Sequence, residues 1–506
     1  MTFPLCHKLP ALCALAMLAG CSLTTAPTGI PVPPPSTATV SLPDPERFTL
    51  ENGLDVWLLH SDHVPLAAAS LILRSGSSAD PEGKDGLLSL ALDMMDEGAG
   101  DRSALDLADE IEFLGASLDI STGKDYSSID LQVLKRNFEA AFDIFSDILL
   151  RPSFSEKEWE RVKRLSLNSL RQRSEQPTSV ARVVGDRLYY GDEHPYSHPE
   201  DGYLATVEKL QLEDVKKAWA GALVPGNCVL LITGDFEPAA LRRRLEERFA
   251  SWKGPAAELP GKTRQSGRIS GQRLVVVDKP GAAQTVIRIY LPAKTYESPE
   301  TPHLVLANTI FGGTFTSRLN SNLREDKKIT YGARSGLASR RIWGHLVASS
   351  SVESGATALG ISEFFREFQA MGEGALRKGE LQKAAATQRS RLIENLQAQS
   401  GLLGIYSTTA AHRLQPAGRR AYYAAMAAAG EKDLEKISKE IYRWENALVV
   451  LVGDRGVIDK ALDGLHKDGA AGEGGLPENF HLPGAEYFSR EGLPEATKAP
   501  AVGEEK

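Results

Sequence analysis

Cysteine is scarce in this sequence, with 4 residues among 506. Cys6 and Cys13 lie in the first twenty residues, which have the composition of a removable secretion signal. If the signal is removed and Cys21 carries a lipid, only Cys228 remains, and an internal disulfide is excluded. Cys228 lies in the apolar run CVLLITG, with no activating cation or base close in sequence. We therefore expect Cys228 to be a small buried core residue rather than a nucleophile.

An excess of basic residues and a long hydrophobic run are also missing. The formal net charge is -8 and no long basic stretch occurs, so nucleic acid is excluded as the main partner. The apolar run ALCALAMLAG, residues 11–20, is too short for a permanent membrane anchor. The hydrophobic content of 42% is ordinary for a globular protein that can bury large cores.

The N-terminus has the features of a bacterial lipoprotein signal. A weakly basic start precedes the apolar run, which ends in LAGC (18–21), and this order resembles the lipoprotein box, where the chain is cut before a cysteine that is then acylated. An ordinary secretion signal with a chance cysteine is the alternative. Ser22 follows Cys21, where an Asp would favour the inner membrane. We therefore expect a lipid-anchored protein of the bacterial periplasm, at the outer membrane.

Composition divides the chain into six predicted segments. They are a lipoprotein signal peptide (1–20), a Pro- and Thr-rich tether (21–45), an N-terminal domain (46–252), a linker rich in Gly, Pro and charge (253–270), a C-terminal domain (271–470) and a polar, disordered tail (471–506). The tether would hold the two domains away from the membrane.

An internal repeat relates the two domains. Corresponding residues at both ends of the unit are separated by nearly the same number of positions, 216 or 219: Asp62 and Asp278, Asn227 and Asn446, Asp235 and Asp454. In each unit, strands and an apolar helix (86–97; 301–312) precede further strands (117–134; 330–352) and long amphipathic helices. This order predicts an α+β fold of two homologous halves, each a mainly antiparallel sheet covered by helices.

The first apolar helix lies in GLLSLALDMMDEGAG (86–100) and has polar residues at a spacing known from zinc peptidases. Ser89, Leu92 and Asp93 stand at i, i+3 and i+4, where the inverted zinc motif H-x-x-E-H places two ligands and a general base. None of the three positions holds the residue that this chemistry needs.

Several segments match one known family: NGLDVWLL, SGSSAD, HPYSHPEDG (194–202), NCVLLITGD, DKPGAAQTVI and, most specifically, FGGTFTSRLNSNLREDKKITYG (311–332). Through these segments the chain from 46 to about 460 resembles the pitrilysin, insulysin and mitochondrial-processing-peptidase family, the inverzincin zinc peptidases. The resemblance implies two halves that form a clamshell. It also implies an Arg and a Tyr over the cleft between them, here Arg324 and Tyr331.

The resemblance also shows what this chain lacks. The two histidines of the family map onto Ser89 and Asp93, its glutamate onto Leu92, and its third ligand falls near Ser169. A catalytic zinc needs three protein ligands and an open position for water, and of these side chains only Asp93 could be a ligand. Leu92 cannot accept a proton from water, so general-base catalysis is lost together with the metal. We expect this chain to bind no cofactor and to keep the helix for its packing.

Other histidines are weaker candidates for a metal site. His194 and His198 form H-x-x-x-H, and His60 and His63 are close in sequence. Histidine spacing alone is weak evidence, so we interpret both pairs as parts of structural loops and turns.

Arg324 and Tyr331, in contrast, are retained. A fixed guanidinium and a phenol can stabilise a developing oxyanion and orient a peptide, and the resemblance implies that they bind the substrate backbone near the scissile carbonyl. The alternative is a surface Arg paired with a neighbouring acid and a Tyr that fills a strand. The nearby pair Gly312 and Gly313 lacks the Lys and Ser/Thr of a phosphate-binding P-loop, so a turn at a helix end is the better interpretation.

These features lead to three hypotheses. The first is a non-catalytic, substrate-binding subunit of a heteromeric zinc metallopeptidase that acts on peptides in the periplasm. It would be inactive alone, and a homologous partner subunit would carry H-x-x-E-H and the zinc. The second is a periplasmic binding or scaffold protein with a peptidase-like fold and no proteolytic role. The third is a residual hydrolase with unusual zinc ligands. In each case the membrane is reached through the lipid anchor only.

Overall fold

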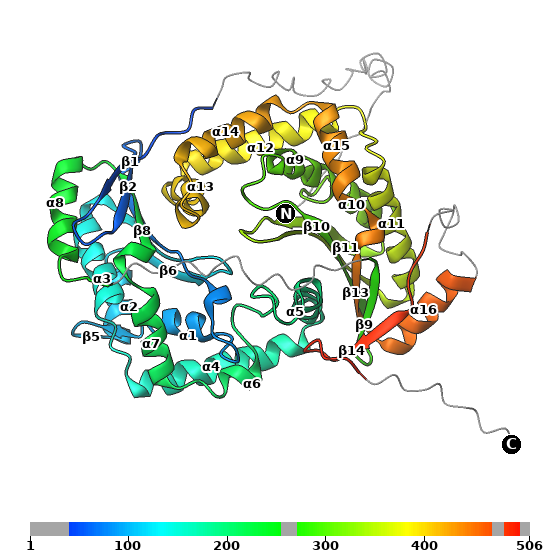
Figure 1. Cartoon of the computed structure of the whole chain (residues 1–506), viewed down its shortest axis with the longest axis horizontal. Helices are drawn as coiled ribbons and strands as arrows, with labels where there is room; N and C mark the ends of the chain where they lie inside the picture. Colours follow the sequence, from blue (N-terminus) through cyan, green and yellow to red (C-terminus); the bar gives the residue numbers. More distant parts are fainter. Residues whose placement is uncertain (1–39, 255–270, 468–479, 496–506) are drawn as a thin grey trace, which may run out of the picture. The chain divides into compact units, whose positions relative to one another are not determined.

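The computed structural model describes residues 40–254, 271–467 and 480–495, which form two six-stranded sheets with helices around them (Figure 1). The predicted signal peptide, the lipidation residue Cys21, most of the tether and residues 255–270 of the linker lie outside the described residues. One sheet belongs to each half of the chain, which confirms the predicted α+β fold of two halves.

The first sheet has its central strands fully buried. Its order is β1 (Glu46–Thr49), β2 (Asp55–His60), β8 (Cys228–Gly234), β3 (Leu66–Leu73), β7 (Ser127–Leu134) and β6 (Ser117–Thr122). Neighbouring strands are antiparallel except β2 and β8, which are parallel. Every residue of β8 is buried, as expected from its unbroken apolar run, whereas exposure alternates along the edge strand β6.

The second sheet repeats five of these strands. Its order is β11 (Thr330–Ala338), β12 (Gly344–Glu353), β10 (Gln284–Ala293), β13 (Leu448–Gly453), β9 (Arg273–Asp278) and β14 (Ala485–Phe488). Read from β11, this order corresponds to β6, β7, β3, β8 and β2 of the first sheet, and the parallel pair of β13 with β9 matches that of β8 with β2. The sheets therefore confirm the internal repeat.

The sixth strand of the second sheet corrects one prediction. We predicted a disordered tail from 471, but β14 pairs in parallel with β9. Phe488 is buried, and the Tyr487 hydroxyl donates a hydrogen bond of 2.9 Å to Asp459 Oδ1. Four residues are too few for a periodic signal, and the strand forms because the apolar edge of β9 offers unpaired backbone groups. Residues 468–479 and 496–506 of the tail lie outside the described residues.

Sixteen helices occur in the described residues, eight in each half. Those of the first half are α1 (Leu87–Asp93), α2 (Ala104–Phe113), α3 (Phe138–Leu150), α4 (Glu156–Glu175), α5 (Pro177–Tyr190), α6 (Leu204–Val207), α7 (Leu212–Ala222) and α8 (Pro238–Phe249). Those of the second half are α9 (Thr301–Phe311), α10 (Arg318–Asn320), α11 (Thr357–Gly372), α12 (Glu380–Gln397), α13 (Gln399–Ala411), α14 (Pro416–Ala428), α15 (Glu431–Ile441) and α16 (Arg455–Lys467). A small hairpin, β4 (Gly98–Ala99) with β5 (Arg102–Ser103), follows α1.

Each half sends one helix to the sheet of the other half. Helix α5 packs in a shared core with β9, β10 and β13, and the Tyr190 hydroxyl lies 2.7 Å from His345 Nδ1 on β12. Helix α13 contacts β3 and β8, where the Thr233 hydroxyl donates a hydrogen bond of 2.6 Å to Gln399 Oε1. This exchange buries the second face of both sheets.

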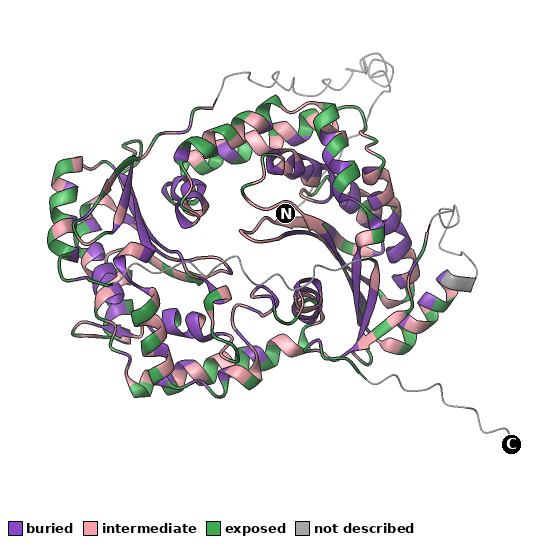
Figure 2. Ribbon diagram, viewed as in Figure 1, coloured by how far each residue is buried: buried purple, intermediate pink, exposed green. Residues whose placement is uncertain are grey.

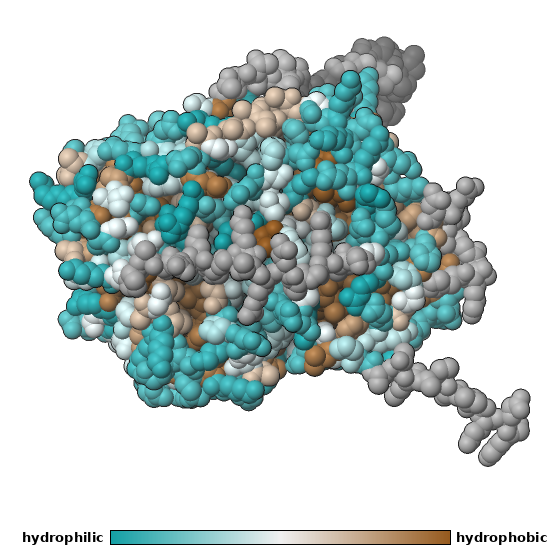
Figure 3. Space-filling view, in the orientation of Figure 1, coloured by the Kyte–Doolittle hydropathy of each residue, from teal (hydrophilic) through white to brown (hydrophobic). Residues whose placement is uncertain are grey.

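The buried residues follow the strands and the sheet-facing sides of the helices (Figure 2). On the face shown in Figure 3, hydrophilic residues predominate and hydrophobic residues form small separate patches. Few large hydrophobic side chains are exposed, among them Phe113, Phe315 and Tyr331. Within the described ranges, no helix combines the length and the apolar character needed to cross a membrane.

Candidate functional site

Helix α1 is apolar on two faces and polar along one edge. Leu88, Leu92 and Met95 pack into the core of the first sheet. On the other side, a second cluster joins α1 to α4, α6 and α7 through Leu87, Leu90, Ala91 and Met94. Ser89 and Asp93, one turn apart, occupy the remaining edge, where Ser89 is half-buried and Asp93 exposed. Both apolar faces of the helix are thus packed against protein.

The residues at the predicted metal positions do not fit a zinc ion. Leu92 is fully buried and has no donor atom, and Ser169, on α4, is an exposed neutral hydroxyl. Only the Asp93 carboxylate remains, whereas zinc needs at least three protein ligands. In the ranges that the structure describes, no group of three or more His, Cys, Asp or Glu is placed to hold a metal ion. The α1 edge therefore offers no zinc chemistry.

The polar edge of α1 is electrostatically acidic. Although Asp93 is exposed, desolvation together with the nearby carboxylates of Asp96, Glu97 and Asp201 raises its pKa to about 7. Burial and Glu97 likewise raise the pKa of Asp96 to about 6. Desolvation and neighbouring negative charge both disfavour the ionised form, so both pKa shifts favour the protonated carboxyl groups.

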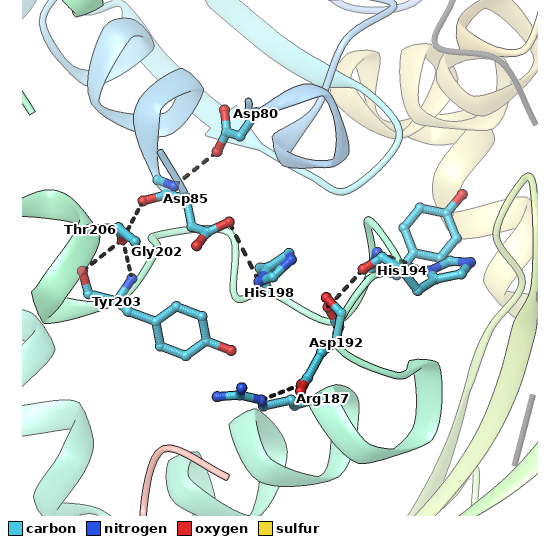
Figure 4. A network of polar contacts seen from close by, with 12 residues as sticks. Asp80, Asp85, Arg187, Asp192, His194, His198, Gly202, Tyr203 and Thr206 are labelled. Atoms are coloured by element: carbon cyan, nitrogen blue, oxygen red, sulfur yellow. Dashed lines mark hydrogen bonds and ion pairs between the residues drawn. The ribbon is translucent and has the colours of Figure 1, made fainter. Parts of the chain in front are cut away.

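A polar network holds the start of α1 (Figure 4). Asp80 accepts hydrogen bonds of 2.9 Å from the backbone amides of Gly86 and Leu88, and burial raises its pKa to about 7. The Thr206 hydroxyl donates to the Asp85 carbonyl, and the Asp85 carboxylate lies 3.5 Å from His198 Nδ1. These contacts fix the N-terminus of the helix to the loop that precedes α6.

His194 and His198 lie in this loop but have different surroundings (Figure 4). His194 is fully buried between the stacked rings of Tyr190 and Trp343, its Nδ1 accepts from the Tyr196 amide at 3.0 Å, and burial lowers its pKa to about 4. His198 is half-buried and paired with Asp85. The two rings thus contact different protein groups, and within the described residues the buried Nε2 of His194 has no hydrogen-bond partner.

The other candidate residues are also placed. His60 and His63 are exposed on either side of Asp62, at 4.0 and 3.5 Å from its carboxylate oxygens. Cys228 is fully buried at the start of β8, and burial raises the pKa of its thiol, which makes it a core residue as predicted.

Arg324 and Tyr331 lie close together along the chain in the second half. Arg324 belongs to η4 (Ser321–Asp326), a π-helical segment of a kind found at functional sites. Its Nε lies 3.2 Å from Glu325 Oε1, and 39% of its side chain is exposed. Tyr331 is 91% exposed at a β-bulge between Thr330 and Ala333 that takes it out of the ladder with β12. Tyr331 is therefore available to a ligand. Arg324 is partly exposed and pairs with the neighbouring acid Glu325, as the alternative interpretation of Arg324 expected.

Phe315 is a neighbour that the sequence did not reveal. Its side chain is 64% exposed, and the Arg324 guanidinium carbon lies 4.5 Å from the centre of its ring. A single phenylalanine in a loop carries no periodic signal, and only its place inside the matched segment 311–332 could have suggested it. Phe315, Arg324 and Tyr331 are together called the aromatic-cationic surface below.

The glycine pair before this surface is a turn, as predicted. Gly312 follows the last residue of α9, and its carbonyl accepts a 2.9 Å hydrogen bond from the Ser335 amide. A Cβ at Gly312 would stand 2.5 Å from the Ser335 backbone nitrogen. The absence of a side chain lets β11 approach the end of α9.

Comparisons with known proteins agree with this architecture. The sequence profile "Insulinase (Peptidase family M16)" matches residues 56–190, and the profile "Peptidase M16 inactive domain" matches residues 209–388. An uncharacterized zinc protease of Mycobacterium leprae is 24% identical over 295 residues, which cover 58% of this chain and 65% of the relative. The match thus spans less than two thirds of that relative.

Two solved structures share the fold. The crystal structure of a peptidase M16 inactive domain from Pseudomonas fluorescens has a TM-score of 0.74 at 21% identity, over 81% of this chain and 98% of that one. A protease from Helicobacter pylori has a TM-score of 0.76 at 19% identity, over 81% and 100%. The two profiles cover more than half of the sequence, one in each half of the duplicated fold, and the chain therefore belongs to peptidase family M16, the insulinase family.

Proposed function

We propose that this chain is the non-catalytic, substrate-binding subunit of a heteromeric zinc metallopeptidase that acts on peptides in the periplasm. A homologous partner subunit with an intact H-x-x-E-H helix supplies the zinc and the general base. Arg324 and Tyr331 of this chain bind the peptide backbone beside the scissile carbonyl. The chain alone hydrolyses nothing.

One contrast within the chain carries the proposal. The α1 edge has Ser89 and Asp93 where the chemistry needs histidines, whereas the aromatic-cationic surface keeps its Arg and Tyr, with Tyr331 exposed and Arg324 partly exposed. A guanidinium and a phenol can donate hydrogen bonds to a carbonyl oxygen as it gains negative charge. A chain that only needed its fold would gain nothing from an exposed Tyr331 at a bulge.

The edge strand β6 adds support for a peptide ligand. It pairs with β7 on one side, and within the described residues no other strand pairs with its outer side. Unpaired amides and carbonyls of an edge strand can bind an extended peptide as an additional strand. Helix α1 contacts β6, so a peptide there would pass beside the former metal positions.

The proposal keeps the location predicted from the sequence, a lipid anchor at Cys21 in the periplasm. Replacement of Cys21 by Ser should abolish labelling of the chain with radioactive palmitate. A Cys21→Ser chain that is still labelled would contradict the anchor at Cys21 but not the peptidase role.

The central test is purification of the tagged chain from its own cells, followed by mass spectrometry and a hydrolysis assay with an unstructured fluorogenic peptide. We expect a homologue with H-x-x-E-H to co-purify. In the assembled complex, Arg324→Ala should lower kcat/KM about 100-fold, the effect of losing one oxyanion donor.

Arg455→Ala is the matched control, since the Arg455 guanidinium also lies over an aromatic ring, 3.7 Å from the centre of the Tyr487 ring, but outside the aromatic-cationic surface. It should leave the rate unchanged. An Arg324→Ala complex with the wild-type rate would overturn the proposal. Recovery of partners without any zinc peptidase would favour the alternative, a periplasmic binding or scaffold protein.

A further inference from the structure

Phe315 is exposed where a purely structural residue would be covered. It lies between α9 and α10 with 64% of its area in contact with solvent, and its contact with the Arg324 guanidinium is on one face of the ring. The second large exposed aromatic of this region, Tyr331, is 91% exposed. Exposed Phe, Tyr and Arg together have the composition of binding hot spots.

A single buried amide links the parts of this surface. The side chain of Asn320 is only 4% exposed. Its Nδ2 donates a 2.7 Å hydrogen bond to the Phe315 carbonyl, and its Oδ1 accepts a 3.1 Å hydrogen bond from the Ala333 amide. Ala333 is the second residue after Tyr331, so Asn320 joins the loop of Phe315 to the strand of Tyr331.

The segment between them is anchored from behind. Asn322 Nδ2 donates 3.0 Å hydrogen bonds to Glu363 Oε2 and to Glu367 Oε1, two buried carboxylates of α11. Because charge-assisted hydrogen bonds in a buried setting are strong, they hold η4, and with it Arg324, against α11. The three exposed residues are therefore carried by a backbone that is fixed before any ligand arrives.

We propose that Phe315 is a third binding residue of this surface, which selects a large apolar or aromatic side chain of an extended peptide. Asn320 is the positioning residue that fixes the Phe315 loop relative to the strand of Tyr331. The inference rests on the proposed function in that the ligand is a peptide. Arg324 and Tyr331 bind the peptide backbone, which is the same in all peptides. Phe315 contacts an apolar side chain of the peptide and therefore makes the surface prefer peptides that have one.

The test measures binding by the zinc-free chain itself, so no partner subunit is needed. The probes are two fluorescein-labelled decapeptides, acetylated and amidated, with three Phe or three Ala among Gly and Ser. Fluorescence anisotropy should give the wild-type chain an affinity about tenfold higher for the Phe peptide, the usual effect of one aromatic contact. Phe315→Ala should abolish this preference and leave the affinity for the Ala peptide unchanged.

Phe113→Ala is the matched control, because Phe113 is 90% exposed on α2 in the first half. It should keep the preference. Asn320→Ala should reduce the preference and speed hydrogen exchange at the Ala333 amide, which a side chain with a merely local packing role would not do. If both peptides bind equally and Phe315→Ala behaves like Phe113→Ala, the role of Phe315 is refuted while the proposed function stands. If the wild-type chain binds neither peptide, the substrate-binding function itself is refuted.

Discussion

The two halves share five strands and an exchanged helix, but their edge strands differ. Two outward amides of β11 are occupied, since Ala333 donates to Asn320 Oδ1 at 3.1 Å and Ser335 donates to the Gly312 carbonyl at 2.9 Å. The outer edge of β6 has no such cover within the described residues. The segment that carries the aromatic-cationic surface therefore closes one edge, and the corresponding edge of the first half stays open. A duplicated scaffold has thus diverged in its loops, where functional residues concentrate.

The largest expected effect is the gain of zinc binding when zinc-ligand side chains are introduced into the first half. The triple variant Ser89→His, Asp93→His, Ser169→Glu places two imidazoles one turn apart on α1 and a carboxylate on α4, which contacts α1. We expect about one zinc per chain after dialysis, measured by elemental analysis, and none in the wild-type chain. With Leu92 unchanged, the variant should bind zinc without hydrolysing peptides.

The control for this variant is the pair Ser89→His, Asp93→His, which has two ligands and should lose its zinc on dialysis. If the triple variant retains no more zinc than the double variant, α1 and α4 do not preserve the geometry of a metal site. The claim that the first half keeps the scaffold of a metal site and lacks only the ligand side chains would then be wrong.

The exchanged helices differ in how closely they approach the sheets. A Cβ at Gly185 of α5 would stand 2.6 Å from the hydroxyl oxygen of Tyr290, which cannot move because it also donates to Asp186 and accepts from Arg288. A Cβ at Gly404 of α13 meets nothing within 4 Å. Gly185→Ala should destabilise the protein by about 1–3 kcal/mol, whereas Gly404→Ala should stabilise it by about 0.5–1 kcal/mol. Denaturant midpoints would show whether the two changes have opposite signs.

The contribution of the acidic edge of α1 to folding stability should change with pH in the opposite sense to that of a salt-bridged carboxylate. The folded-state pKa of Asp93 is raised to about 7, so between its unfolded value and pH 7 the folded chain binds the extra proton, and stability rises as the pH falls through 7. Asp93→Asn should therefore stabilise the chain at pH 8 by about 1 kcal/mol, a value reduced for solvent exposure, and have no effect below about pH 4.

Asp235→Asn is the control for this change. The Lys135 ammonium, 2.5 Å from the Asp235 carboxylate, lowers the pKa of Asp235, so its stabilisation is present above its unfolded pKa and is lost as the pH falls through the folded pKa. Melting temperatures of both variants between pH 4 and 8 would test the contrast. An Asp93→Asn variant that is less stable than the wild type at pH 8 would contradict it.

Much of the fold was predictable because its signals are local and repeated. The continuous apolar runs of β8 and β13 and the alternation in β6 and β7 indicated strands, and the constant offset between halves indicated duplication. The exchange of α5 and α13 was not predictable, since an apolar helix face does not specify which sheet it covers. Strand β14 was missed because four residues show no period.

The candidate site was likewise predictable from the sequence only in part. The loss of ligand side chains at the zinc positions could be inferred from residue types at fixed spacing. The matched motif suggested that Arg324 and Tyr331 bind substrate, which stays a prediction. The roles that we propose for Phe315 and Asn320 could not be found in this way, because they depend on contacts that no spacing encodes. These contacts are the guanidinium over the Phe315 ring and the hydrogen bond of Asn320 to β11. Electrostatic effects such as the raised pKa of Asp93 also depend on three-dimensional neighbours.

The smallest expected effect on stability concerns the turn between Arg324 and Tyr331 in the chain. Lys328 has a φ of 56°, a left-handed conformation that costs a residue with a Cβ about 1 kcal/mol. Lys328→Gly should therefore raise the free energy of unfolding by about 0.5 kcal/mol. The relief of strain is larger than this, but glycine also increases the conformational entropy of the unfolded chain, which offsets part of it. Lys327→Gly is the control, because Lys327 has a φ of -86° and lies 3.8 Å from Glu363.

The control variant should lose stability by a similar amount. Opposite shifts of the denaturant midpoint would mean that strain at Lys328 is accepted in order to place Arg324 and Tyr331 on one closed edge of the second sheet. Equal shifts would mean that the backbone at Lys328 is not strained. The closed edge of the second sheet would then carry no loss of stability relative to the open edge of the first sheet.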